Sequence, residues 1–161
     1  MERILEAVYR DRRLTVALKL LSHIIVLYAV AHFAYHLLVL AQRSLADFAV
    51  AVITSGVSLF AVSLARRLIK APRPREIYGF YGGEKPKRSA SFPSRHAFSV
   101  FFVAVSALTT LPSSAAVLLV LGVLLCAARV LVGLHFIRDC VAGALIGIVG
   151  GALCIAAVAL V

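Results

Sequence analysis

The sequence has 161 residues, 62% of them apolar, with a mean hydropathy of +1.00 and no tryptophan. A soluble domain is usually about 45–50% apolar, so this composition excludes an ordinary soluble globular protein. The net charge of +10 would indicate nucleic-acid binding in a soluble chain, but here the charges lie between long uncharged runs. We therefore expect the basic residues to face a membrane surface and not to bind nucleic acid.

The first segment, residues 1–13, is too polar to cross a membrane. Ile4, Leu5 and Val8 recur at helical spacing, which predicts a short helix lying in the membrane interface. The apolar run that follows is longer than the roughly 7–15 residues of a secretory signal core, and no small-residue cleavage site comes after it. We therefore expect this run to be a membrane helix rather than a secretory signal.

Membrane helices are predicted from four runs that contain no Asp, Glu, Lys or Arg. These runs are residues 20–42, 48–65, 97–128 and 140–161. A bilayer-spanning helix needs roughly 20 mainly apolar residues, and Pro112, followed by two serines, divides the third run. The sequence thus predicts an all-α polytopic membrane helix bundle that forms one domain over residues 1–161. The five expected spans are residues 15–41, 46–69, 95–111, 114–134 and 138–160.

Five spans place the N-terminus, the loop 70–94 and the turn 134–139 on one side of the membrane. Every Lys and Arg except Arg43 then lies on or near that side. The positive-inside rule indicates that this face is cytoplasmic, and such a face attracts anionic lipids by about 1 kcal/mol per nearby cation. The composition of the loop 70–94 is equally compatible with a solvated connector and with a substrate-binding loop on the catalytic side.

Polar residues gather at three helix ends on the charged side. In chain order they are Arg66 and Arg73, then Ser94, Arg95 and His96, then Arg129, His135 and Asp139. The predicted topology brings all three groups to one face of the membrane, although they lie far apart in the sequence.

The residue types in these groups suit phosphate chemistry. Arginine binds phosphate oxygens bidentately, and a serine with free N–H groups at a helix start forms an anion site. His135 and Asp139, four residues apart, can meet, and the carboxylate would fix the tautomer and leave one imidazole nitrogen free to attack. His96 would protonate a leaving oxygen. Taken alone, each of these residues could have a structural role instead of a catalytic one. A histidine can pack at a helix end, an arginine can lie at the membrane boundary on the cytoplasmic side, and Asp139 can cap the last helix.

The three groups resemble the signature of the type-2 phosphatidic acid phosphatase superfamily, which has the patterns K-x6-R-P, P-S-G-H and S-R-x5-H-x3-D. The corresponding residues here are Arg66-x6-Arg73-Pro74, Pro93-Ser94-Arg95-His96 and Ala128-Arg129-x5-His135-x3-Asp139. Arginine replaces the usual lysine at 66 and the glycine at 95, and alanine replaces the serine at 128. Membrane members of this family usually have six spans, one more than we predict.

The resemblance implies that His135 is a nucleophile that forms a phospho-histidine, that Asp139 orients it and that His96 is the acid. Arg66, Arg73, Ser94 and Arg129 would bind the phosphate, while Arg95 adds a cation or faces lipid headgroups. The implied activity is hydrolysis of a lipid phosphate or pyrophosphate without metal or cofactor, in a bacterial cytoplasmic membrane. Candidate substrates are phosphatidic acid, phosphatidylglycerophosphate and polyprenyl phosphates or diphosphates.

Two other functions stay open: a phosphotransferase that passes the phosphate to another acceptor, and a non-catalytic anion-binding membrane protein. The sequence gives no indication of oligomeric state.

Overall fold

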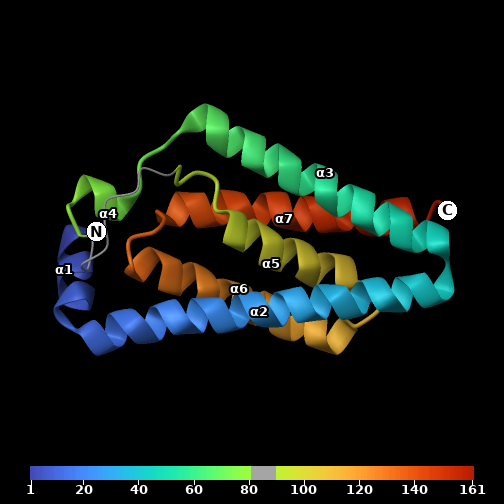
Figure 1. Ribbon diagram of the computed structural model, residues 1–161, viewed down its shortest axis with the longest axis horizontal. Coiled ribbons are helices and arrows are strands. Elements are labelled where there is room, and N and C mark those ends of the chain that lie inside the picture. Colours follow the sequence, from blue (N-terminus) through green and yellow to red (C-terminus); the bar gives the residue numbers. More distant parts are fainter. Residues whose placement is uncertain (81–89) are drawn as a thin grey trace.

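The computed structural model describes residues 1–80 and 90–161, and every regular element within these two ranges is a helix. Figure 1 shows these helices as an elongated bundle. In chain order they are α1 (Glu2–Arg10), α2 (Arg12–Arg43), α3 (Leu45–Ile69), α4 (Pro74–Ile77), α5 (Arg95–Ser106), the 3-10 helix η1 (Ala107–Thr109), α6 (Pro112–Leu131) and α7 (Ile137–Val158). The predicted all-α fold class is therefore confirmed.

Within residues 1–80 and 90–161, four segments are long and apolar enough to cross a bilayer: α2, α6, α7 and the segment Leu45–Ile77, which contains α3. The remaining predicted span, 95–111, is shorter, because α5 ends at Ser106 and only η1 follows it. The 12 residues of α5 extend about 18 Å at 1.5 Å per residue, against a hydrocarbon core of roughly 30 Å. Length therefore supports four of the five predicted spans.

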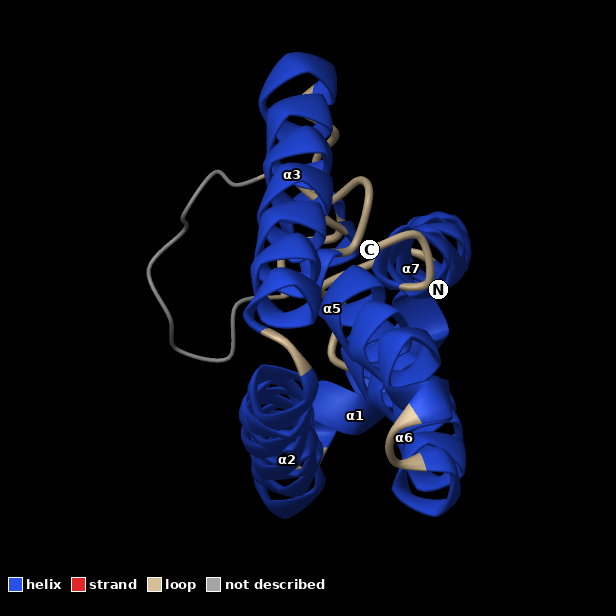
Figure 2. Ribbon diagram, turned by 90° about the vertical axis from the view of Figure 1, so that its right-hand side faces the viewer, coloured by secondary structure: helices blue, strands red, loops and turns tan. Residues whose placement is uncertain are grey.

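The short helix α5 lies in the middle of the bundle, and Figure 2 shows α2, α3, α6 and α7 around it. It packs most extensively against α7, where small residues let the two backbones approach. A Cβ atom at Gly147, for example, would lie 2.5 Å from the carbonyl oxygen of Phe98. Because Phe98 and Phe102 are also buried, α5 is enclosed by protein, and its first turn is held firmly at one end of the bundle.

The outward faces of the surrounding helices are apolar. Leu27 on α2 is 68% exposed, Phe60 on α3 is 67% exposed and Val120 on α6 is 64% exposed. Large apolar side chains exposed over several helices form a surface that is unfavourable in water and suited to lipid. Together with the long apolar helices, this surface makes the chain an integral membrane protein.

Capping residues set the helix boundaries. Asp11 separates α1 from α2, because its Oδ1 atom accepts hydrogen bonds from the N–H groups of Arg13 (2.8 Å) and Leu14 (3.2 Å). The predicted spans leave residues 112–113 between them, two residues later than the turn in the structure. Pro112 is the first residue of α6, where a helix needs no N–H donor, and the turn falls at residues 110–111.

One end of the bundle collects the C-terminal end of α3, the start of α5 and the connection between α6 and α7 (Figure 1). The helices α1 and α4 lie at the same end. The loop 70–94 contains α4, and the part of it at 81–89 lies outside the described residues. The three polar groups found in the sequence therefore meet at a single end of the molecule.

Candidate active site

His135 lies in the connection between α6 and α7, which we call the histidine loop (residues 132–136). The loop turns at Gly133, whose φ of +65° lies in the left-handed region that favours glycine. The backbone N–H groups of Leu134 and His135 both donate to the carbonyl oxygen of Arg129, at 3.0 and 3.3 Å. These bonds turn the His135 side chain into the bundle, where it is 2% exposed.

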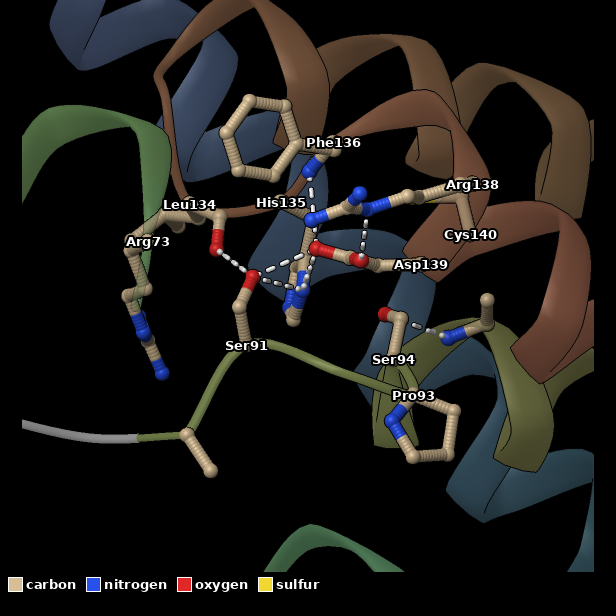
Figure 3. Close-up of polar contacts among 12 residues, drawn as sticks. Arg73, Ser91, Pro93, Ser94, Leu134, His135, Phe136, Arg138, Asp139 and Cys140 are labelled. Atoms are coloured by element: carbon tan, nitrogen blue, oxygen red, sulfur yellow. Dashed lines mark hydrogen bonds and ion pairs between the residues drawn. The ribbon is translucent and has the colours of Figure 1, made fainter. Parts of the chain in front are cut away.

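Asp139 occupies the first turn of α7 and is fully buried. Its Oδ2 atom accepts a hydrogen bond from the backbone N–H of Phe136 (2.9 Å) and lies 3.8 Å from Nδ1 of His135, as Figure 3 shows. The Asp139 carboxylate therefore does both things that the sequence suggested for it: it caps α7 and it pairs with His135. Arg138 Nε lies 3.7 Å from the other oxygen, Oδ1.

Ser91 is a member of this cluster that the sequence reasoning missed. Its Oγ atom donates a hydrogen bond to Asp139 Oδ2 at 2.5 Å and lies 3.4 Å from His135 Nδ1 (Figure 3). The only sequence signal was its place two residues before Pro93. Spacing within the motif directed attention to Ser94 instead, because Ser94 matches the family pattern.

The three side chains together define the tautomer of His135. Ser91 gives its proton to Asp139, so both Ser91 Oγ and the carboxylate present acceptor oxygens to Nδ1 of His135. This network assigns the ring proton to Nδ1 and leaves Nε2 with its lone pair. A buried imidazole with an unprotonated Nε2 can act as a nucleophile or as a base.

The charge state of His135 fits that assignment. Burial lowers the pKa of His135 below its usual value. The neighbouring Asp139 opposes this shift, whereas the positive charges of Arg73 and Arg129 reinforce it. The neutral, nucleophilic form of the ring is therefore favoured at neutral pH.

Arg66, predicted to bind phosphate, contacts the residues before α5, which we call the serine segment (residues 90–94). Arg66 is 8% exposed in the last turn of α3. Its Nη1 atom donates to the carbonyl oxygens of Ser91 (3.0 Å) and Pro93 (2.5 Å), and its Nη2 atom donates to that of Ala90. In this structure Arg66 thus holds the segment that carries Ser91, and its role as a phosphate ligand stays a prediction.

Ser94, also predicted to bind phosphate, caps α5. Its Oγ atom accepts a hydrogen bond from the N–H of Ala97 (3.4 Å), and its own N–H donates to the carbonyl oxygen of Asp139 (2.9 Å). The second bond joins the start of α5 to the first turn of α7. Ser94 is fully buried, so its observed contacts position the two helix ends next to each other.

The remaining predicted residues surround the same space. His96, in the first turn of α5, lies close enough to Arg66, Arg95, Arg129 and His135 to interact with them electrostatically. The N–H groups of the first turn of a helix have no intrahelical acceptor, so the start of α5 adds donors to this group of cations. The structure therefore places both histidines, the arginines and a helix N-terminus around one position suited to an anion.

Arg73 joins the same cluster from the residue before α4. Its positive charge interacts with those of Arg66 and Arg129 and with His135. Its backbone N–H donates to Glu76 Oε2 at 3.3 Å. All eight predicted site residues are thus brought to one end of the bundle, with Arg95 the most exposed of them.

Beside this cluster lies an apolar groove of about 440 Å³ between α2, α3 and α5. Arg95 and His96 line one part of it, and apolar side chains such as Phe33, Leu59 and Phe102 line the rest. The volume falls within the range of about 300–1,000 Å³ typical of ligand sites. An amphiphile can therefore place its polar group among the cations and its chain in the groove.

No three His, Cys, Asp or Glu side chains in the described part of the chain converge on a common metal position. The charge that faces an anion here comes from the arginines.

Residues 44–160 match the sequence model of the PAP2 superfamily. The structure resembles the crystal structure of a transmembrane PAP2-type phosphatidylglycerolphosphate phosphatase from Bacillus subtilis, with a TM-score of 0.69 and 20% sequence identity. The match covers 95% of this chain and 81% of the other. No curated protein sequence matches the chain. At this identity the structural likeness shows a shared fold.

Proposed function

Because the chain belongs to the PAP2 superfamily, we propose that it is an integral membrane phosphatase that removes the terminal phosphate of a lipid phosphate or lipid pyrophosphate. The observation that carries the proposal is the contact of His135 Nδ1 with Ser91 and Asp139, in a cluster with His96 and the arginines; this contact assigns the ring proton to Nδ1 and leaves Nε2 free to attack. A nucleophile, an acid and a cationic pocket in one place are the parts that phosphoryl transfer requires.

In the proposed reaction, His135 Nε2 attacks the terminal phosphorus and the bond from phosphorus to the leaving oxygen breaks. In the free protein, burial and the nearby arginines lower the pKa of His96. In this proposal the bound phosphate offsets those positive charges, so His96 takes up a proton when substrate binds and gives it to the leaving oxygen, and a neutral alcohol or a protonated phosphate departs. His96 then takes a proton from water as the water oxygen attacks the phospho-histidine. The P–N bond breaks, its electron pair returns to Nε2 and inorganic phosphate is released, while Nδ1 keeps its proton throughout.

The arginines supply the electrostatic part of the mechanism. Arg73, Arg95 and Arg129, with the N–H groups at the start of α5, would stabilise the negative charge on the equatorial oxygens. Arg66 and Ser94 would contribute mainly by holding the serine segment and the start of α5. In this proposal the cations perform the charge stabilisation that a metal ion provides in other phosphoryl-transfer enzymes, so turnover needs no metal.

The proposed substrate is an amphiphile, because the groove next to Arg95 and His96 is apolar. Phosphatidylglycerophosphate is our first candidate, supported by the substrate named for the Bacillus subtilis structure. Phosphatidic acid and polyprenyl phosphates or diphosphates carry the same combination of chain and terminal phosphate. Anionic lipids of the surrounding bilayer would accompany the basic face.

The test is phosphate release by the detergent-purified protein, with no metal added. The panel contains phosphatidylglycerophosphate, phosphatidic acid, undecaprenyl diphosphate and farnesyl diphosphate. We expect turnover that vanadate inhibits and EDTA does not. Vanadate binding by folded protein without turnover of any of these lipids would favour the non-catalytic anion-binding alternative, and a phosphorylated acceptor alcohol would identify a phosphotransferase.

We further propose that the site faces the cytoplasm of a bacterial cell, because every Lys and Arg of the described residues except Arg43 lies at or near that end. The test uses a variant in which Cys126, Cys140 and Cys154 are replaced by serine and a single cysteine is introduced at a chosen position. A cysteine at position 43 should react with a membrane-impermeant maleimide in intact cells, and one at position 10 only after lysis. Labelling of position 10 from outside would reverse the orientation.

Ser91→Ala is expected to lower kcat by about 10- to 100-fold, because a hydrogen bond to a charged group contributes about 1.5–3 kcal/mol. Without the hydroxyl, Oδ2 of Asp139 keeps the Phe136 N–H as its hydrogen-bond donor, and the carboxylate can rotate away from His135. The measurement compares kcat and KM for the lipid that the panel identifies. Ser113→Ala, an exposed serine in the first turn of α6, is the control. Equal kcat in both variants would remove Ser91 from the mechanism.

A further inference from the structure

The histidine loop is bound from outside by α1 and by α4. The hydroxyl of Tyr9, near the end of α1, donates to the carbonyl oxygen of Val132 at 3.1 Å. The backbone N–H of Arg75, in α4, donates to the next carbonyl oxygen, that of Gly133, at 3.0 Å. Two successive peptide groups that precede His135 are therefore fixed by elements outside α6 and α7.

Apolar packing from α1 reaches the same backbone. Leu5 is fully buried, and a Cβ atom added at Gly133 would lie 2.7 Å from Leu5 Cδ2. One turn further along, Val8 packs in a cluster with Val132 and Leu134. The side chains of α1 thus contact the turn of the histidine loop with no space between them.

The helix α1 is itself held in place. The rings of Tyr9 and Phe80 stack with centroids 5.8 Å apart, which joins α1 to the residues after α4. The Thr15 hydroxyl donates to the carbonyl oxygen of Val8 at 2.7 Å, which joins α1 to α2. A helix connected on both sides can transmit its position to the loop that it contacts.

We propose that α1 is a positioning element of the active site, in which Leu5 and Tyr9 hold residues 132–134 so that His135 faces the phosphate. This inference rests on the proposed function. The helix lies outside residues 44–160, which match the family, so the role belongs to the part of the chain that the family pattern does not cover. Displacing a reacting group by 1 Å can lower a rate by about 100-fold, which makes such support consequential.

Two substitutions test the proposal on the full-length protein. We expect Leu5→Ala to lower kcat by about tenfold or more and Tyr9→Phe by about threefold, with KM changed less than about twofold. Leu5→Met keeps most of the volume and should restore kcat. Ile4→Ala is the matched control, because Ile4 is the next residue of α1 and is 45% exposed. Its kcat should equal that of the wild type.

The pH profile separates positioning from a loss of folded protein. Protonation of His135 inactivates the enzyme as the pH falls, and burial holds the pKa of this ring low. When Leu5→Ala loosens the loop and admits water, that pKa should rise toward the ordinary value of about 6.5. The acidic limb of kcat/KM against pH, which reports groups of the free enzyme, therefore moves to higher pH, a change that a smaller amount of folded enzyme cannot produce.

Amide hydrogen exchange of residues 132–135 provides a readout that does not depend on turnover. Exchange should be faster in Leu5→Ala and Tyr9→Phe and unchanged in Ile4→Ala. If Leu5→Ala does not fold, the result for Tyr9→Phe decides the question.

Unchanged hydrogen exchange, an unchanged kcat and an unchanged acidic limb in the folded variants would overturn the positioning role, as would a higher KM with unchanged kcat. A wild-type protein that releases no phosphate contradicts the proposed function instead, and the exchange rates still decide whether α1 holds the loop.

Discussion

Replacing His135 by alanine is expected to lower phosphate release by at least about 10⁴-fold, because the variant lacks the nitrogen that becomes phosphorylated. The bundle should still form, since α6 and α7 are held by packing along their whole lengths rather than by this ring. Activity on the lipid that the panel identifies measures the effect. Radiolabelled phosphate trapped on the protein during turnover should appear in the wild type and be absent from the variant.

The matched control for this substitution is His23→Ala. His23 lies on an exposed face of α2, and its Nδ1 contacts the carbonyl oxygen of Lys19 at 2.7 Å. It should keep full activity and full labelling. A His135→Ala protein that retains more than about a tenth of the wild-type rate would place the nucleophile elsewhere, because no residual binding effect replaces a lost covalent step.

The second large effect is expected for Asp139→Asn, with kcat lowered by about 10³- to 10⁴-fold, as for an orienting carboxylate in a catalytic triad. The amide nitrogen of asparagine is a donor, so it can hydrogen-bond to an unprotonated Nδ1 of His135. That contact moves the ring proton to Nε2 and removes the nucleophilic lone pair. Steady-state kinetics should show the loss in kcat, with KM changed little.

Asp47→Asn is the control for this variant, because Asp47 also lies in the first turn of a helix, α3, at the opposite end of the bundle. Thermal unfolding in detergent should give a similar midpoint for both proteins if the Asp139 effect is chemical. An Asp139→Asn enzyme within about tenfold of wild-type kcat would show that Ser91 and burial alone orient His135.

Sequence reasoning located the long helices because charges are costly inside a bilayer, so the uncharged runs mark the spans directly. It was less successful near Pro112, where a proline is equally compatible with a turn and with the first position of a helix. The short helix α4 was not predicted, since the four residues of Pro74–Ile77 carry no periodic pattern. The end of α5 at Ser106 was not predicted either, because the apolar run continues through the 3-10 helix that follows it.

The convergence of the three polar groups followed from topology and the family pattern, and the structure places them at one end. The contacts of Arg66 and Ser91 could not be foreseen. They join residues 24 to 48 positions apart, and such pairs leave no trace in spacing. The pattern identifies which residue types occur at a site, whereas their hydrogen-bond partners depend on how the serine segment crosses the end of α3.

The contact between Arg66 and the serine segment has a consequence for how this part of the chain tolerates change. Arg66 binds the carbonyl oxygens of Ala90, Ser91 and Pro93, and every amino acid supplies a carbonyl oxygen. A substitution at position 90 therefore leaves the bonds from Arg66 available. An insertion or deletion of one residue between 90 and 93 shifts the carbonyl oxygens along the chain and misplaces Ser91 relative to Asp139. Natural variation here should alter which side chains occur and leave the number of residues constant.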